Sequence, residues 1–338
     1  MTPLLSVEDL RVYFPSGQRG ETVKAVDGVT FSVGAGETFG IIGESGSGKS
    51  TLARAMVGLI PPTDGRIFHA GQDIATMSGA EFARHRRSFQ IVFQDPNAAL
   101  DPRMSIGQTV REPLDIVNAD SRADRDRRVL RLLDHVGLNP ELALRYPHEL
   151  SGGQKQRANI ARALALEPKL IVCDEVVAAL DVSIQADILN LFARLQAELG
   201  LAYVFITHDL GVVGHVADRI AVMYLGKLVE MGSADQILHH PLHPYTKALL
   251  SSEPLPLPKA MRTGTRIVLE GEIPSPVSPP SGCRFRTRCW MTQDKCAEKE
   301  PAWLKYGADR WNACHFTDFN RDGEASDRAP SAAMPPAH

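Results

Sequence analysis

Residues 43–50, Gly-Glu-Ser-Gly-Ser-Gly-Lys-Ser, constrain the fold of this chain more than any other segment. They match G-x-x-x-x-G-K-[ST] and lie between a predicted strand, Thr38–Ile42, and a predicted helix, Thr51–Gly58. Glycines let backbone N–H groups face a phosphate, and the positive end of the helix faces the same charge. We expect Lys49 to neutralise β- and γ-phosphate oxygens and Ser50 to coordinate Mg²⁺. The predicted ATP-binding residues here are Gly43, Glu44, Ser45, Gly46, Ser47, Gly48, Lys49, Ser50 and Thr51.

A second segment supplies the acids that such a site needs. The apolar run Leu170–Cys173 is a predicted buried strand and is followed by Asp174 and Glu175. We expect Asp174 to hold Mg²⁺ through water and Glu175 to be the base that polarises the attacking water. Two adjacent acids at a strand end are otherwise often a solvated turn, so this prediction depends on the phosphate loop.

Short apolar runs alternate with helical patterns as far as about Met231, which predicts an α/β domain with a largely parallel sheet. The clearest helix is Ser183–Leu199. Strand patterns are missing from Pro96 to Glu149, where a charged helix is predicted at Ser121–Val136, so we expect a helical subdomain inserted into the core. The predicted strands are Val7–Phe14, Val29–Val33, Thr38–Ile42, Phe89–Phe93, Leu170–Cys173, Ala202–Ile206, Ile220–Tyr224 and Leu228–Met231.

Charge and hydropathy limit the partners and the location. The 37 Lys and Arg residues against 40 Asp and Glu argue against a general polyanion binder, so no nucleic-acid partner is expected. No run approaches the roughly 18 consecutive apolar residues of a membrane-spanning helix, and Met1–Leu10 lacks a signal-peptide pattern. We therefore expect the chain to stay in the cytoplasm and to reach a membrane only through a partner protein.

A second glycine-rich segment, Leu150–Gln154, opens the predicted helix Lys155–Ala165. Two helix N-termini suited to phosphate in one chain suggest that the second serves a nucleotide held by another molecule. Leu-Ser-Gly-Gly-Gln is also the signature of the ATP-binding subunits of ABC transporters, which this sequence resembles. The resemblance implies a P-loop (RecA-like) core and a set of residues that act on the partner's ATP, namely Ser151, Gly152, Gly153, Gln154 and the D-loop residue Asp181.

Other motifs of that family lie in the family's order. The resemblance implies that Gln94, in the Q-loop, senses Mg²⁺ and the water and passes that state to the membrane subunit. It also implies that His208, the switch histidine, holds the γ-phosphate. The family stacks adenine on an aromatic residue of the first strand, which is Tyr13 or Phe14 here. The D-loop has Ala178 where Ser is usual, so we expect weakened communication between sites.

Within this class, the chain is most similar to the ATPases of oligopeptide and dipeptide importers, from about Leu4 to Phe316, and more to the F-type than to the D-type partner. The resemblance implies a heterodimer with a homologous sister, two integral-membrane permeases and, indirectly, an extracytoplasmic solute-binding protein. The chain would be peripheral at the cytoplasmic face of the inner membrane. The segments that carry the similarity include Ala25–Val29, Gly43–Gly46, Ile91–Met104, Ala179–Gln185, His243–Thr246 and Pro279–Phe285.

After His240 the composition shifts to proline-rich segments, Pro254–Pro258 and Pro274–Pro280. We expect an ATPase domain at 1–235 with its helical subdomain at about 96–165. A loop-rich C-terminal extension is expected at 236–319 and a disordered tail at 320–338.

Four of the five cysteines lie in the extension: Cys283, Cys289, Cys296 and Cys314. Four thiolates in a loop-rich segment can hold a [4Fe–4S] cluster or a structural zinc, and the usual paired C-x₂-C of zinc sites is missing. The resemblance favours the iron–sulfur cluster, whereas four unliganded thiols are the alternative. Cys173, within a predicted strand, is expected to be a buried apolar thiol.

The sequence therefore predicts an ATPase that energises import of di- or oligopeptides, or a related small solute, through separate permeases. One alternative is a soluble ABC ATPase that acts on DNA or in translation, although the long coiled coil or second ATPase domain usual in those proteins is missing. Another is an iron- or redox-sensing module in which ATPase activity is secondary.

Overall fold

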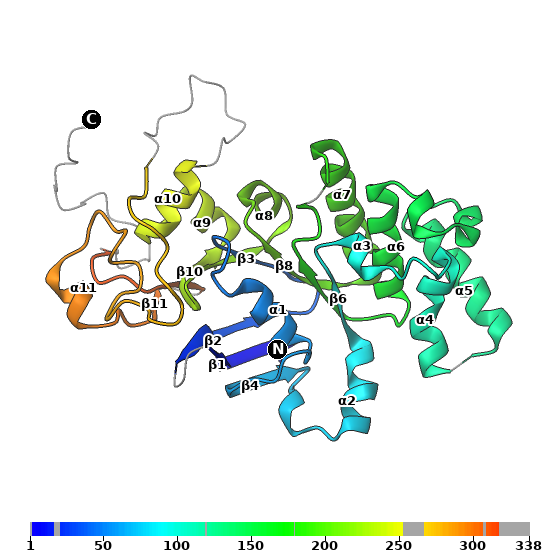
Figure 1. Cartoon of the computed structure of the whole chain (residues 1–338), viewed down its shortest axis with the longest axis horizontal. Coiled ribbons are helices and arrows are strands. Elements are labelled where there is room, and N and C mark those ends of the chain that lie inside the picture. Colours follow the sequence, from blue (N-terminus) through cyan, green and yellow to red (C-terminus); the bar gives the residue numbers. More distant parts are fainter. Residues whose placement is uncertain are drawn as a thin grey trace.

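The computed structural model describes residues 2–16, 21–118, 120–178, 180–252, 267–306 and 309–317 (Figure 1). Its strands are β1 (Leu5–Pro15), β2 (Thr22–Val33), β3 (Thr38–Ile42), β4 (Asp64–His69), β5 (Gln72–Asp73), β6 (Phe89–Val92), β7 (Leu170–Asp174), β8 (Ala202–Thr207), β9 (Arg219–Tyr224), β10 (Lys227–Ser233), β11 (Leu304–Tyr306) and β12 (Arg310–Asn312). They form an eight-stranded sheet, in the order β11-β12-β10-β9-β3-β8-β7-β6, and a four-stranded antiparallel sheet, in the order β2-β1-β4-β5.

The centre of the large sheet is parallel: β3 pairs with β8 and β9, and β7 pairs with β6 and β8. Every residue of β3, β7 and β8 is buried, as expected for parallel strands that are covered on both faces. The carboxyl ends of these strands therefore meet at one edge of the sheet. The phosphate loop, the acidic pair and the segment with His208 all begin at that edge.

Helices surround this core. Those outside the segment between β6 and β7, as far as residue 239, are α1 (Lys49–Met56), α2 (Gly79–His85), α7 (Val182–Leu199), α8 (Leu210–Val216) and α9 (Ala234–His239), with 3₁₀ turns η1 (Ile74–Thr76) and η2 (Arg86–Ser88). Between β6 and β7 the described chain is helical, as predicted, and Figure 1 shows this part beside the large sheet. It comprises α3 (Pro96–Ala99), α4 (Ile106–Val117), α5 (Arg122–His135), η3 (Pro140–Leu144), η4 (Pro147–Glu149) and α6 (Gly152–Leu164).

Two local predictions needed correction, and two strands were not predicted. Strand β2 begins at Thr22 and not at Val29, and β4 and β5 were not predicted, because only two residues of β4 are buried and its apolar pattern is weak. Helix α6 begins at Gly152 and not at Lys155. Ser151 caps this helix through the amide of Gln154, so the two glycines lie inside its first turn.

The C-terminal extension joins the large sheet. It contains α10 (Pro244–Ser252), α11 (Asp294–Glu298), β11 and β12, and β12 pairs with β10, with Trp311 opposite Met231. Among the described helices, none combines the length and apolarity needed to cross a bilayer. The expected linker at Pro254–Pro258, the D-loop residue Ala179 and the tail at 320–338 lie outside the described residues.

Candidate ATP site

The phosphate loop follows β3 and is shaped by two neighbouring segments. Gly48 has a φ of 104°, and a Cβ there would lie 2.0 Å from the carbonyl oxygen of Ala25 in β2, so only glycine fits. The amide of Gly226, in the turn between β9 and β10, donates to the carbonyl of Ser47 at 2.8 Å. Ser45 and Gly46 form the exposed tip of the loop.

Lys49 lies buried at the base of this loop. Its Nζ donates to the carbonyl oxygens of Gly43 at 2.7 Å and Glu44 at 2.9 Å, and lies 3.4 Å from Ser47 Oγ. Burial lowers the pKa of Lys49, whereas the nearby carboxylates of Glu175 and Asp174 raise it. Loop carbonyl oxygens thus hold the Lys49 ammonium group in place beside two acids. There it is the cation that an anionic phosphate can pair with.

Ser50 and Asp174 join the start of α1 to the end of β7. Ser50 Oγ donates to Asp174 Oδ1 at 2.9 Å. Burial raises the pKa of Asp174, and the hydrogen bond from Ser50 opposes that rise. A hydroxyl and a carboxylate side by side are the hard oxygen donors that Mg²⁺ takes, so these two residues fit the predicted magnesium site.

Glu175 contacts the other two predicted catalytic residues, Gln94 and His208. Gln94 Nε2 donates to Glu175 Oε2 at 2.7 Å, and His208 Nδ1 lies 3.2 Å from Oε1. The amide of Glu175 donates to the carbonyl of Ile206 at 2.8 Å, and its φ of 49° lies in the left-handed region. Segments that follow β6, β7 and β8 thus converge on the Glu175 carboxylate. The backbone of Glu175 has a strained conformation of the kind common at functional sites.

The signature residues lie elsewhere. Ser151 and Gly152 are exposed at the N-terminus of α6, and Figure 1 shows α6 apart from α1. Gly153 is buried, and a Cβ on it would lie 2.9 Å from Ile184 Cγ2 of α7. Asp181 is the exposed N-cap of α7 and makes no capping bond with its side chain.

The two candidate adenine-stacking residues have different environments. The Tyr13 hydroxyl donates to the carboxylate of Asp27, and burial, with that bond, raises the pKa of Tyr13 to about 12. Phe14 is 37% exposed. Of the two rings, that of Phe14 is therefore the more accessible to a stacking base.

Sequence reasoning missed one group of residues near the phosphate loop. The loop residue Glu44 is bonded by Tyr245 of α10 and by Arg288 of the cysteine-bearing segment. The spacing of these residues in sequence gave no signal for the contact, because it depends on how the extension folds back onto the core.

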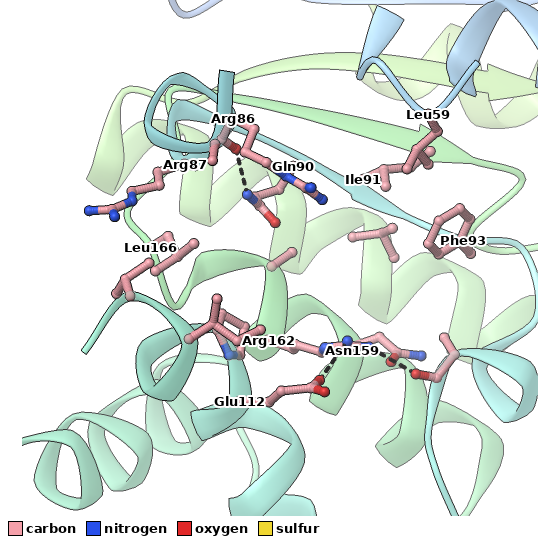
Figure 2. A pocket seen from close by; sticks show the side chains of 17 residues that line it. Leu59, Arg86, Arg87, Gln90, Ile91, Phe93, Glu112, Asn159, Arg162 and Leu166 are labelled. Carbon is pink, nitrogen blue, oxygen red and sulfur yellow. Dashed lines mark hydrogen bonds and ion pairs between the residues drawn. The ribbon is translucent and has the colours of Figure 1, made fainter. Parts of the chain in front are cut away.

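A groove of about 370 Å³ lies between the core and the helical subdomain and is lined in part by residues 90–93, which directly precede Gln94 (Figure 2). Apolar side chains from both sides reach it, including Phe93, which is 37% exposed, and Ile116, which is 77% exposed. An ion pair of 2.7 Å between Glu112 and Arg162 forms part of its wall.

The four extension cysteines are all described. Burial raises the pKa of Cys283 to about 11 and that of Cys289 to about 12, and each of these thiols is also influenced by Cys296 and Cys314. The amide of Met291 donates to Cys289 Sγ at 3.4 Å. Nevertheless, within the described part of the chain no group of three or more His, Cys, Asp or Glu side chains is arranged to hold a metal ion.

Comparison with known proteins decides the family. Residues 26–178 match the ABC transporter family, and residues 229–296 match the C-terminal region of oligopeptide/dipeptide transporters. The chain is 52% identical over 306 residues to the oligopeptide transport ATP-binding protein OppF of Salmonella typhimurium, which covers 88% of this chain and 92% of that protein. This chain belongs to the oligopeptide transport family of ABC ATPases. The ABC ATPase is also 48% identical over 319 residues to the oligopeptide transport ATP-binding protein AppF of Bacillus subtilis, with 93% of this chain and 97% of that protein covered.

Comparison with solved structures leads to the same family. A dimeric ATP-binding cassette in a post-hydrolysis state, bound to ADP and Pi, is 31% identical, with a TM-score of 0.62, over 68% of this chain and 98% of that chain. The predicted fold class, the F-type resemblance and the assignment as a transport-coupled ATPase are confirmed. As a member of this family, the chain takes ATP with Mg²⁺ and works with membrane permeases.

Proposed function

We propose that this ABC ATPase energises the import of di- or oligopeptides, or of a related small solute, through two separate permeases. The main support is the match of residues 229–296 to a region that characterises oligopeptide and dipeptide transporters, together with about half identity to OppF over most of the chain. Neither a DNA- or translation-linked ATPase nor a sensing module explains that similarity. The solute-binding protein acts indirectly, and the chain lies at the cytoplasmic face of the inner membrane.

The site geometry supports a separate role for each of the site residues. Lys49 neutralises the β- and γ-phosphates, and Phe14 stacks on adenine. Ser50, Asp174 and Gln94 hold Mg²⁺, which when bound neutralises phosphate charge. Glu175 takes the proton of the attacking water, and its contacts with Gln94 and His208 at 2.7 and 3.2 Å hold that carboxylate in place.

The site is completed by a second subunit. Ser151, Gly152 and Asp181 are exposed at the N-termini of α6 and α7 and, with Gly153 and Gln154, act on the ATP of a homologous sister, while the sister's equivalents act on ATP bound here. Besides the Gln154 amide that Ser151 caps, the N-terminus of α6 offers the first backbone N–H groups of the helix and a positive partial charge to that phosphate. Nucleotide binding closes the dimer, and hydrolysis reopens it.

We propose that the permeases dock at the groove between the core and the helical subdomain (Figure 2). Its apolar side chains are exposed, and one of them, Phe93, directly precedes Gln94, which contacts Glu175. The test is copurification of tagged permeases with the full chain. Ile116→Arg should abolish copurification while ATP binding persists, and Leu144→Arg, at an 83% exposed position outside the groove, is the matched control. Equal recovery of wild type and Ile116→Arg would contradict this docking. Recovery of nucleic acid or ribosomes in place of permeases would contradict the transport function.

We further propose that Cys283, Cys289, Cys296 and Cys314 hold a [4Fe–4S] cluster, with structural zinc as the alternative. The support is the resemblance to peptide importers and the set of four thiols in one extension, where the amide of Cys283 donates to the carbonyl of Cys296 at 2.7 Å. The described side chains are not gathered for a metal ion, so binding has to draw the four thiols together. Burial favours the neutral thiols of Cys283 and Cys289, so a bound metal ion would be what ionises them. Anaerobically purified protein should contain about four irons and four sulfides per chain. About one zinc per chain would support the alternative, and no metal would contradict both.

A further inference from the structure

Glu44, the second residue of the phosphate loop, uses all three of its polar groups. Its amide donates to the Tyr245 hydroxyl at 2.9 Å, and its carbonyl accepts from Lys49 Nζ at 2.9 Å. Its carboxylate accepts from both terminal nitrogens of Arg288, at 2.7 and 3.1 Å. Two of these three partners lie in the C-terminal extension, so the extension and Lys49 are bonded to the same residue.

The ion pair between Arg288 and Glu44 is partly buried and bidentate. The Arg288 side chain is 8% exposed and that of Glu44 is 24% exposed, so water and salt screen the pair less than a surface pair. The two parallel bonds fix the carboxylate in direction as well as in distance. Bonding to Glu44 raises the pKa of Arg288 against the effect of its burial.

A second contact joins the same extension loop to the other side of the site. Arg284 donates to the carboxylate of Asp27, which also accepts from Tyr13, and to the carbonyl of Leu225. Residues 283–289 therefore contact both the phosphate loop and β2, whose Asp27 also accepts from Tyr13 in β1, the strand of the candidate adenine-stacking residues.

We propose that Arg288 and Tyr245 are positioning residues for ATP: they fix Glu44, and through its carbonyl they fix Lys49 and the open shape of the phosphate loop. A loop that is ordered before binding loses less conformational entropy when phosphate enters it. Removing either contact therefore weakens ATP binding and leaves the chemical step at Glu175 nearly unchanged. This inference rests on the ATP site proposed above.

The test uses the full chain, with MgATP affinity from calorimetry and steady-state kinetics in the assembled transporter. Arg288→Gln should weaken ATP binding about tenfold, as loss of a charge-assisted pair predicts, and raise KM similarly with kcat within about twofold. Arg286→Gln is the matched control, because the Arg286 side chain, in the same loop, bonds only to Ser281 among the described residues. Tyr245→Phe should weaken binding about threefold to tenfold for loss of one hydrogen bond.

A double-mutant cycle separates positioning from general damage. Glu44→Gln should also weaken binding, and Glu44→Gln combined with Arg288→Gln should be no weaker than the worse single variant, because both changes remove one pair. If Arg288→Gln does not fold, Arg288→Lys, which keeps the charge without the paired geometry, replaces it in the cycle. Additive effects, or equal losses in Arg286→Gln, would overturn the inference. Lys49→Ala distinguishes the two proposals: ATP affinity and hydrolysis that are both unchanged in that variant would contradict the ATP site itself.

Discussion

Replacing Arg310 with Ala tests how firmly the extension is docked. Arg310 begins β12, the strand that joins the extension to β10, and its side chain is 3% exposed. It lies 3.4 Å from Glu230 Oε1 and donates to the carbonyl of His240. Glu230 is fully buried and accepts from the amides of Leu242 and His243 at 2.9 Å each.

Removing the guanidinium leaves the Glu230 carboxylate without its cation. Burial already raises the pKa of Glu230, although the amide bonds and Arg310 oppose that rise. Breaking a buried ion pair from one side destabilises proteins by about 3–5 kcal/mol. At roughly 2–4 °C per kcal/mol, the melting temperature should fall by about 10 °C. Urea denaturation and thermal melting of the full chain measure both quantities.

The control removes both charges. Glu230→Gln combined with Arg310→Met keeps the volume and one of the two acceptor contacts, because Gln has a single carbonyl oxygen, so a large part of the lost free energy of unfolding should return. A loss below about 1 kcal/mol in Arg310→Ala, or an equally large loss in the double variant, would refute the reasoning that an uncompensated buried charge is the cause.

Three other predictions follow from single sites. Lys49→Ala should weaken MgATP binding at least about tenfold in calorimetry, because it removes the one side-chain cation of residues 43–50; slow hydrolysis with unchanged affinity would assign Lys49 to the transition state instead. Ser151→Arg should fold but silence the site built on the sister's phosphate loop in a mixed dimer, whereas loss only at this chain's own site would contradict the cross-dimer arrangement. His69 is buried against Phe89, and burial lowers its pKa to about 4. Because the unfolded chain then binds a proton more readily than the folded one, the free energy of unfolding should fall as the pH drops below 6.5, by about 2 kcal/mol at pH 5. His69→Gln should flatten that decline in urea denaturation across pH 5–8, and an unchanged slope would contradict it.

Much of the ATP site was predictable because its residues follow strands that are short, apolar and buried. Asp174 and Glu175 come directly after β7, and parallel strands bring their carboxyl ends to one edge. The bonds from Gln94 and His208 to Glu175 depend on the loops after β6 and β8, which only the family resemblance indicated.

The extension was less predictable for a physical reason. Its prolines and scattered polar residues have no helical or strand period, so the sequence did not indicate that β12 would pair with β10. Nor could it place Arg288 against Glu44, 244 residues away in sequence. Long-range ion pairs follow from tertiary packing, and no local pattern specifies them.

The central claim is that Glu175 is the base of a transport-coupled ATPase, and Glu175→Gln tests it most directly. Gln keeps the shape and can still accept a hydrogen bond from Gln94, but it cannot take a proton. Phosphate release by the assembled transporter, measured with saturating MgATP, should fall by about 10²–10⁴-fold, while calorimetry shows ATP affinity nearly unchanged. Turnover within about threefold of wild type, well short of that loss, would contradict the account.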